Sequence, residues 1–391
     1  MIKFEKAIDI IKANQVLLDS EKVDLKESLN RVLREDVVSD INMPPFNKSA
    51  MDGYACRIED LANELEVIEI IQAGYEPLKM IGKNECSKIM TGAMIPDGAD
   101  CVIMIEEVEE LFKSKIKFKG EKTSNNICLL GEDVVVGQKL LSAGMRITAK
   151  EIASLALCGH VNPLVSKKPK IGIIATGDEI VEPYLTPKKS QIRNTNSYQL
   201  IAQCIQFGCE ATYYGIALDT EDAISQTIIK AKEENDLIII TGGVSMGDFD
   251  LVPSVLIKNG FEILFDQVAI QPGKPTVFGR CENKFIFGMP GNPVSSFICF
   301  EIFVKEFLSG LVGLKDHTKI FKMQLTKEIK RKKNKRLAWV PVKINSEGKA
   351  ESVEYHGSAH INALVFADGI TSIPIGVNEI KEGSVVDVRQ I

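Results

Sequence analysis

The spacing of apolar residues changes several times along this chain of 391 residues. At the N-terminus, MIKFEKAIDIIKANQVLL carries apolar residues at helical spacing, and an extended stretch follows as far as Asp40. Between about Tyr54 and Gly137 the apolar residues form short β-branched runs separated by glycines, which predicts an all-β region. Helical spacing returns in TAKEIASLALCGH, where Thr148 can cap a helix and Gly159 can end it.

From Lys170 to about Leu311 the pattern alternates between strand, loop and helix. The apolar runs KIGIIAT and DLIIITGG predict buried strands, and SYQLIAQCIQFG, TEDAISQTIIKAKEEN and VSSFICFEIFVKEFLSG predict helices. Such alternation is typical of a mostly parallel sheet that is covered by helices. After about Asp316, short alternating strands return and predict a small terminal β-domain.

These patterns predict a multidomain chain of mixed α/β and β class, and the chain length agrees with two to four domains. We expect a central three-layer α/β domain over residues 167–315 and a β-rich domain over 43–138. A small terminal β-domain would cover residues 316–391.

The composition narrows the class of partner. Lys and Arg number 47 against 53 Asp and Glu, so the net charge of −6 provides no general basic face for nucleic acid. No apolar run approaches the ~18 residues of a membrane span. The nine cysteines contain no C-x-x-C pair and lie mostly in apolar runs, as expected for buried thiols in a reducing compartment. We therefore expect a soluble cytoplasmic protein that binds neither nucleic acid nor membrane.

Glycines and acids follow three of the predicted parallel strands, in Thr176–Glu179, Leu218–Thr220 and Thr241–Asp250. Ligands of open α/β sheets bind beyond these strand ends, and glycines there let backbone N–H groups approach an anion. Several carboxylates around one anion pocket imply a hard cation such as Mg²⁺. Taken alone, Asp178 could be a turn former and Asp219 a helix cap, but three similar strand ends favour a ligand site.

Other loops could contribute to the same chemistry. Gly288–Ser295 leads into a helix with Pro293 at its first position, so the N–H groups behind it form either an anion site or a tight turn without ligand. Gln271–Pro275 presents Lys274 as a candidate phosphate contact. Asp52, Thr91 and Asp133 each lie in a polar turn of the predicted β-structure. Each of these turns, taken alone, could lack a functional role. The chain lacks both G-x-G-x-x-G after a strand and the P-loop motif, which argues against ordinary dinucleotide and P-loop NTPase sites.

An ordered set of motifs resembles one known family. PPFNKSAMDGYA, IMTGAMIPDGADCVIMIEE, GEDV, GIIATGDEI, IRNTNSYQL, TGGVSMGD, PGKP and MPGNPVSS run from about Pro44 to Ser296. In this order they are similar to the molybdopterin molybdenumtransferases, the MoeA and gephyrin E-domain family. TGGVS alone would also suit related molybdopterin-binding folds, whereas the full set with MDGYA upstream is highly specific.

The resemblance implies a four-domain elongated subunit whose central domain binds molybdopterin, and a homodimer whose active cleft draws on both chains. In this layout an elongated helical or linker domain combines residues 1–42 and 139–166, and a C-terminal β-barrel-like domain covers 316–391. It implies that molybdate, as substrate, is inserted into the dithiolene of adenylylated molybdopterin with release of AMP and with Mg²⁺ present. A contact with the molybdopterin adenylyltransferase would follow from the shared intermediate. By the family motifs, the catalytic residues would be Asp52, Glu179, Asp219 and Asp250, with Asp219 and Asp250 also holding the metal. The implied substrate-binding residues are Thr91, Asp133, Asp178, Asn196, Gly242, Gly243, Ser245, Lys274, Pro290, Pro293 and Ser358.

The chain departs from the family pattern at two places. Gln271 stands where relatives commonly have Lys before PGKP, and Ile127–Leu130 stands where many have Arg before GED. Both changes remove positive charge from the expected anion site. Each lost charge contact would weaken binding by ~1 kcal/mol or more if the contact is desolvated. We expect weaker substrate affinity rather than loss of function, because every acidic position is kept.

Two other functions stay open at this stage. Gephyrin shows that this fold can serve as a scaffold that binds partner peptides, although a pure scaffold has no need of Asp52, Asp219 and Asp250 together. A tungstate-inserting relative would have the same motifs, because molybdate and tungstate are nearly equal in size and charge.

Overall fold

The structure is a computed structural model that describes residues 1–244, 251–315, 318–355 and 357–391. It divides the chain into two compact units. The first unit comprises Met1–Glu35, Ala143–Ile152 and Asn162–Ile391, and the second comprises Asp36–Ser142 and Ala153–Val161. Along the sequence, the second unit therefore consists of two segments inserted into the first.

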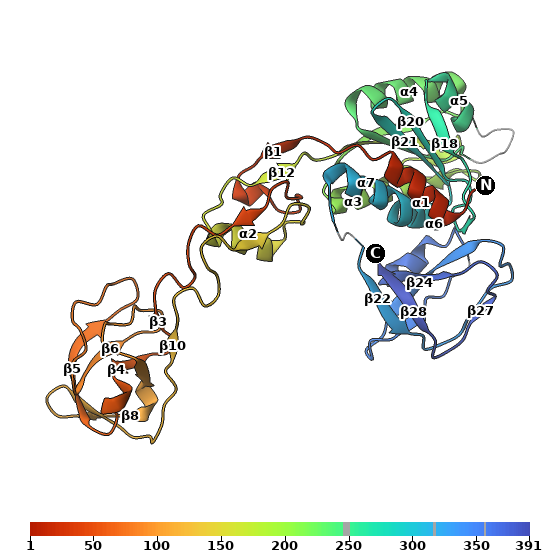
Figure 1. Ribbon diagram of the computed structural model, residues 1–391. Coiled ribbons are helices and arrows are strands. Elements are labelled where there is room, and N and C mark those ends of the chain that lie inside the picture. Colours follow the sequence, from red (N-terminus) through yellow and green to blue (C-terminus); the bar gives the residue numbers. More distant parts are fainter. Residues whose placement is uncertain (245–250, 316–317, 356) are drawn as a thin grey trace. The chain divides into compact units, whose positions relative to one another are not determined.

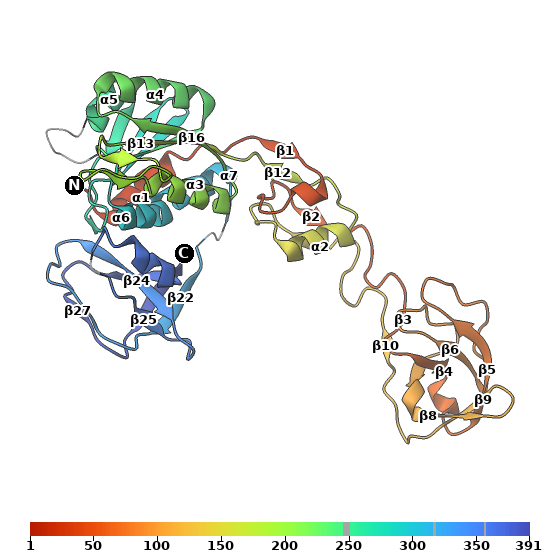
Figure 2. The same ribbon diagram turned by 180° about the vertical axis from the view of Figure 1, so that it is seen from behind.

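A six-stranded sheet in the order β16-β13-β17-β21-β20-β18 forms the centre of the first unit (Figures 1 and 2). The first four strands are parallel, whereas β20 pairs antiparallel with both β21 and β18. The bounds are β13 Lys170–Thr176, β16 Glu210–Ala217, β17 Leu237–Thr241, β18 Glu262–Phe265, β20 Val277–Cys281 and β21 Lys284–Met289. The predicted mostly parallel sheet is confirmed.

Helices cover both faces of this sheet. Ile171 and Ile173 of β13 belong to one apolar core and Ile174 to another, because successive side chains of a strand point to opposite faces. Figures 1 and 2 show α4 and α5 on one face and α3, α6 and α7 on the other, so the predicted three-layer α/β class is confirmed. The bounds are α1 Phe4–Ala13, α3 Asn196–Phe207, α4 Glu221–Glu234, α5 Val252–Lys258, α6 Pro293–Cys299, the π-helical turn η4 Phe300–Val304 and α7 Lys305–Val312.

The last of these helices, expected as one continuous helix, contains the π-helical turn η4 between α6 and α7. Glu301 lies in this turn and is 2% exposed. Its carboxylate accepts a hydrogen bond from Gln203 Nε2 (2.8 Å) and forms an ion pair with Lys305. These partners compensate a charge that would otherwise be costly to bury.

The N-terminal helix α1 packs on the α/β core. Its Phe4 ring lies 5.6 Å from the ring of Phe303 and 5.7 Å from that of Trp339, and Ala7 and Ile11 are fully buried in the same core. The predicted boundaries instead group this helix with residues 139–166, and those boundaries stay a prediction. The other elements near the junction are β1 Ser20–Lys22, η1 Leu25–Glu27, α2 Ala149–Leu157 and β12 Leu164–Ser166, with β1 antiparallel to β12.

A second sheet forms the C-terminal part of the first unit, in the order β19-β24-β26-β28-β22, with β25 paired to β24 and a separate pair β23-β27. Its strand β19 comes from the α/β segment and pairs parallel with β24, which joins the two parts through backbone hydrogen bonds. The bounds are β19 Ile270–Gln271, β22 Ile320–Gln324, β23 Ile329–Lys330, β24 Leu337–Ile344, β25 Ala350–Ser352, η5 Ile361–Phe366, β26 Gly369–Ile373, β27 Glu379–Ile380 and β28 Val385–Gln390.

The second unit is built mainly on a six-stranded sheet in the order β7-β4-β6-β5-β9-β8, together with the short pairs β2-β11 and β3-β10. Its core includes Tyr54, Cys56, Cys86 and Cys101. All nine cysteines are free, and all but Cys128 and Cys281 are buried, which agrees with their expected packing role. The bounds are β2 Val37–Val38, β3 Lys48–Ser49, β4 Gly53–Cys56, η2 Ile58–Asp60, β5 Glu64–Ile71, β6 Glu85–Ile89, β7 Cys101–Met104, η3 Ile105–Glu107, β8 Val108–Leu111, β9 Lys115–Phe118, β10 Ile127–Cys128 and β11 Lys139–Leu141.

Candidate active site

A cleft of about 1000 Å³ lies at the carboxyl ends of the parallel strands β13, β17 and β21. Its walls come from these strand ends, from the short strands β14 (Ile180–Val181) and β15 (Ile192–Arg193), and from the C-terminal segment at Ala359 and Ile361. Of the predicted site residues that the structure describes, seven line this cleft: Glu179, Asn196, Asp219, Gly242, Gly243, Pro290 and Pro293. The parallel sheet therefore brings together residues that are far apart in the sequence, at the strand ends where ligands of open α/β sheets bind.

Two carboxylates meet at the ends of β13 and β16. The backbone N–H of Asp178 donates to Asp219 Oδ2, and the N–H of Asp219 donates to Asp178 Oδ1, each over 3.2 Å. The cap of α4 is Thr220, whose hydroxyl accepts from the N–H of Ala223 (3.3 Å), so the alternative role of Asp219 as a helix cap does not apply. Glu179 is the next residue on the cleft wall and is exposed.

This acidic corner has the chemistry of a hard-cation site. Two adjacent carboxylates repel each other unless a cation lies near them, and Mg²⁺ typically takes one or two carboxylates together with substrate oxygens and water. Among the described residues, no group of three or more His, Cys, Asp or Glu side chains is arranged to hold a metal ion. Asp219 lines the cleft and Asp178 does not, so Asp219 is the carboxylate of this pair that is placed to share a cation with substrate oxygens. The predicted metal ligand Asp250 and the predicted substrate-binding Ser245 lie outside the described residues.

A glycine turn forms the floor of the cleft after β17. Gly242 has φ +99° and Gly243 has φ +60°, a region that favours glycine. A Cβ atom on Gly242 would lie only 2.3 Å from the carbonyl oxygen of Thr176. The turn and the end of β13 are therefore packed against each other too closely for any side chain at position 242.

Thr176 is a functional candidate that sequence reasoning did not select. It lines the cleft and is 3% exposed, and its hydroxyl oxygen is buried with no hydrogen-bond partner in the part of the chain that the structure describes. A buried hydroxyl without a partner is costly, and the glycine turn covers this one, so a ligand would bond to it only after a small shift of the turn. The available signal was its position as the polar residue that ends the apolar run of β13.

Asn196, predicted to bind substrate, makes hydrogen bonds within the protein. It is the first residue of α3, and its Nδ2 donates to Thr241 Oγ1 (2.8 Å) and to the carbonyl oxygen of Gly291 (2.9 Å). It thereby ties the end of β17 to the Pro-Gly-Asn turn before α6. The side chain holds two walls of the cleft in register.

The turn before α6 meets the C-terminal segment. The N–H of Val294 donates to the carbonyl oxygen of Ser358 (3.0 Å), so one donor of the expected anion site behind Pro293 is already used. Ser358 itself contributes through this carbonyl, while its neighbour Ala359 lines the cleft. Lys274 is exposed, and among the described residues its loop contributes Pro275 rather than Lys274 to the cleft wall. Gln271 is also exposed, in β19.

The second unit holds the remaining predicted residues. Antiparallel pairing of β4 with β6 sets Gly53 opposite Ile89, which brings the loops that carry Asp52 and Thr91 together. Asp52 Oδ1 accepts from the backbone N–H of Thr91 (2.6 Å) and from its hydroxyl (2.8 Å). These two hydrogen bonds favour the charged form of Asp52 and hold its pKa below the usual value. The bond from the backbone N–H has the larger effect, and the bond from the hydroxyl has the smaller one. Asp133 is exposed, and its N–H donates to the carbonyl oxygen of Met43 (3.0 Å).

Comparisons with known proteins agree with the motifs. Family models match residues 2–159 as the MoeA N-terminal region (domain I and II), 172–310 as a probable molybdopterin binding domain and 322–391 as the MoeA C-terminal region (domain IV). A protein of Staphylococcus epidermidis named molybdopterin molybdenumtransferase is 35% identical over 397 residues, which cover 99% of this chain and 95% of the relative. This chain belongs to the molybdopterin molybdenumtransferase family. The predicted resemblance is thus confirmed and extends over nearly the whole chain.

Further members of the molybdopterin molybdenumtransferase family support the assignment. One from Bacillus subtilis is 36% identical over 388 residues, covering 95% of this chain and 90% of the relative. The crystal structure of the molybdopterin biosynthesis moeA protein from Pyrococcus horikoshii OT3 matches with a TM-score of 0.84 at 31% identity and covers 100% of both chains. The cleft residues from Ala175 to Pro293 fall within the segment matched as a probable molybdopterin binding domain.

Proposed function

We propose that this protein inserts molybdate into adenylylated molybdopterin in the cleft at the ends of β13, β17 and β21, with release of AMP. The observation that carries the proposal is the position of that cleft within the segment matched as a probable molybdopterin binding domain. Its volume of about 1000 Å³ suits a ligand of nucleotide size or larger. The glycine turn at Gly242 lets the backbone approach such a ligand closely.

The acidic corner supports a role for Mg²⁺ in this reaction. Asp219 would hold the ion together with Asp250, which was predicted from the motifs, and Asp178 lies beside Asp219. When bound, Mg²⁺ would neutralise charge on the phosphate oxygens of the substrate. The protein side of the chemistry is then to place two carboxylates where an otherwise repelled anion can enter with its cation.

The wider setting of the reaction also belongs to the proposal. Family membership supports a homodimer, in which the Asp52–Thr91 pair of one copy and the cleft of the other copy act in the same reaction. It also supports transfer of the intermediate from the molybdopterin adenylyltransferase. The nine free thiols suit the reducing cytoplasm. In the part of the chain that the structure describes, none of the helices combines the length and apolar composition needed to cross a bilayer.

The test is to combine purified protein, adenylylated molybdopterin, molybdate and Mg²⁺ and to measure AMP over time. We expect Mg²⁺-dependent AMP release, most of which Asp219→Asn should abolish. Asp222→Asn is the matched control, because Asp222 is an exposed acid of the same segment that does not line the cleft. No AMP above a protein-free reaction would exclude the transferase and favour a scaffold, and faster release with tungstate than with molybdate would make it a tungstate-inserting enzyme.

A further inference from the structure

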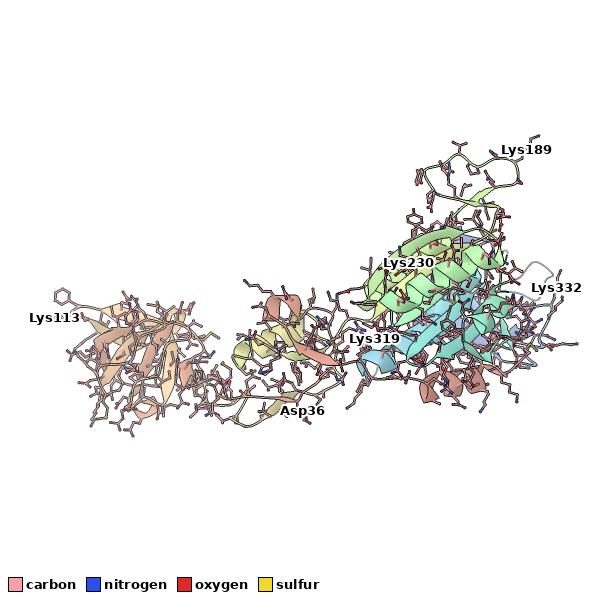
Figure 3. All side chains as sticks on the ribbon, turned by 90° about the horizontal axis from the view of Figure 1, so that it is seen from above. Asp36, Lys113, Lys189, Lys230, Lys319 and Lys332 are labelled. Atoms are coloured by element: carbon pink, nitrogen blue, oxygen red, sulfur yellow. The ribbon has the colours of Figure 1, made fainter. Side chains whose placement is uncertain are left out.

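The segment between β14 and β15 forms one rim of the cleft. β14 and β15 pair in parallel, with Ile180 opposite Ile192 and Val181 opposite Arg193. Arg193 lines the cleft, whereas Lys189 lies at the outer end of a loop that stands away from the sheet (Figure 3). One short segment therefore carries a cation that faces the cleft and another that faces solvent.

Arg193 is the one Lys or Arg among the described residues that line the cleft. Its Nε donates to the carbonyl oxygen of Leu185 (3.2 Å), and its two terminal nitrogens have no hydrogen-bond partner within the described residues. One guanidinium nitrogen is thus hydrogen-bonded within the protein, and the two terminal nitrogens are available to a ligand. Such a group is suited to bind two oxygens of a phosphate-like anion.

Hydrogen bonds on both sides hold the rim segment in place. The Glu182 carboxylate accepts from the hydroxyls of Tyr198 (2.9 Å) and Tyr213 (2.8 Å), and Asn194 Nδ2 donates to the Tyr213 oxygen (2.8 Å). The backbone N–H of Asn194 also donates to the carbonyl oxygen of Val181 (2.8 Å). Arg193 therefore lies in the paired strand β15 and directly precedes the anchored Asn194, so its backbone needs little ordering when an anion binds.

We infer that Arg193 binds a tetrahedral oxyanion of the substrates in this cleft, either the phosphate of the adenylyl group or molybdate. The inference rests on the proposed function for the identity of these anions. The cleft wall otherwise presents the acids Glu179 and Asp219, so a substrate anion needs at least one cation on the protein.

The experiment titrates AMP and, separately, molybdate into the full-length protein by calorimetry at low and at raised salt, with Mg²⁺ present. Arg193→Gln should weaken binding of one or both anions by about tenfold or more, since charge-assisted hydrogen bonds are lost. It should also make the remaining affinity less sensitive to salt. Lys189→Gln makes the same charge change on the same segment outside the cleft, and should alter affinity less than about twofold.

The outcomes identify which anion Arg193 binds. They also distinguish failure of this inference from failure of the proposed function. Loss for AMP alone assigns Arg193 to the adenylyl phosphate, and loss for molybdate alone assigns it to the metal oxyanion. Unchanged affinity for both, equal losses in the two variants, or a wild-type protein that binds neither anion would overturn the inference. Wild-type protein that binds AMP through Arg193 and yet releases none from adenylylated molybdopterin would overturn the proposed function alone.

Discussion

At the scale of single residues, the hydroxyl of Thr176 is a test of whether the cleft floor is built for a ligand. Thr176→Val removes a buried hydroxyl that lacks a partner among the described residues and keeps the shape, so we expect equal or higher stability. Thr276→Val is the matched control, because that buried hydroxyl donates to the carbonyl oxygen of Gly273 (2.7 Å) and its loss should cost about 1 kcal/mol. Thermal unfolding measures the stability of both variants. AMP titration measures whether Thr176→Val weakens binding, as it should if a ligand bonds to this hydroxyl. Equal destabilisation by the two changes would show that the Thr176 hydroxyl is bonded in the folded protein.

The pKa of Asp52 gives a second prediction at this scale. Its folded value lies below the unfolded one, so its contribution to stability is present above the unfolded pKa of about 3.8 and is lost as the pH falls through the folded pKa. Thr91→Val removes the hydroxyl donor and keeps the backbone donor, so the pKa of Asp52 should rise only part of the way. Carboxyl-carbon NMR titration measures it, and an unchanged value would show that the backbone N–H alone sets the pKa.

At the scale of elements, the contact between the β17 turn and the end of β13 determines the shape of the cleft floor. Gly242→Ala combines a left-handed backbone at φ +99° with a Cβ only 2.3 Å from a backbone oxygen, so we expect a loss of about 2 kcal/mol or more in unfolding free energy. Gly215→Ala shares the positive φ, at +87°, but its Cβ would meet nothing within 4 Å. It should therefore cost only about 1 kcal/mol. Denaturant unfolding of both variants tests the comparison, and equal losses would show that β13 shifts to relieve the contact.

At the scale of the whole molecule, the proposed homodimer can be tested by complementation. Asp52 and Asp219 belong to different compact units, and each single Asp→Asn variant should lose most AMP release. If the site combines residues from two copies, mixing the variants should recover activity, up to about one quarter of wild type for random exchange between dimers with one intact site. Subunit exchange is verified with differently tagged chains. Mixed dimers without activity, after verified exchange, would place all the required residues in one copy.

The sequence by itself determined the elements and the class of this protein. The run KIGIIAT is a strand, and TEDAISQTIIKAKEEN contains a helix, because apolar spacing decides locally which faces can be buried. Strand-end chemistry also predicted that Glu179, Asp219 and Gly242 would share one cleft, since parallel strands end at the same edge of a sheet. The ordered motifs then indicated the family.

Only the tertiary structure decided how those side chains are used. Ser358 occupies the N–H of Val294, Asn196 joins Thr241 to Gly291, and Arg193 faces the cleft. Each of these facts depends on groups from separate elements meeting, and local propensity carries no information about such partners. The same holds for α1, whose periodicity predicted a helix while its packing on the α/β core was set by Phe303 and Trp339, more than 290 residues away. Hydrogen bonds and apolar contacts between distant segments are satisfied only once the sheet, its helices and the C-terminal strands are assembled.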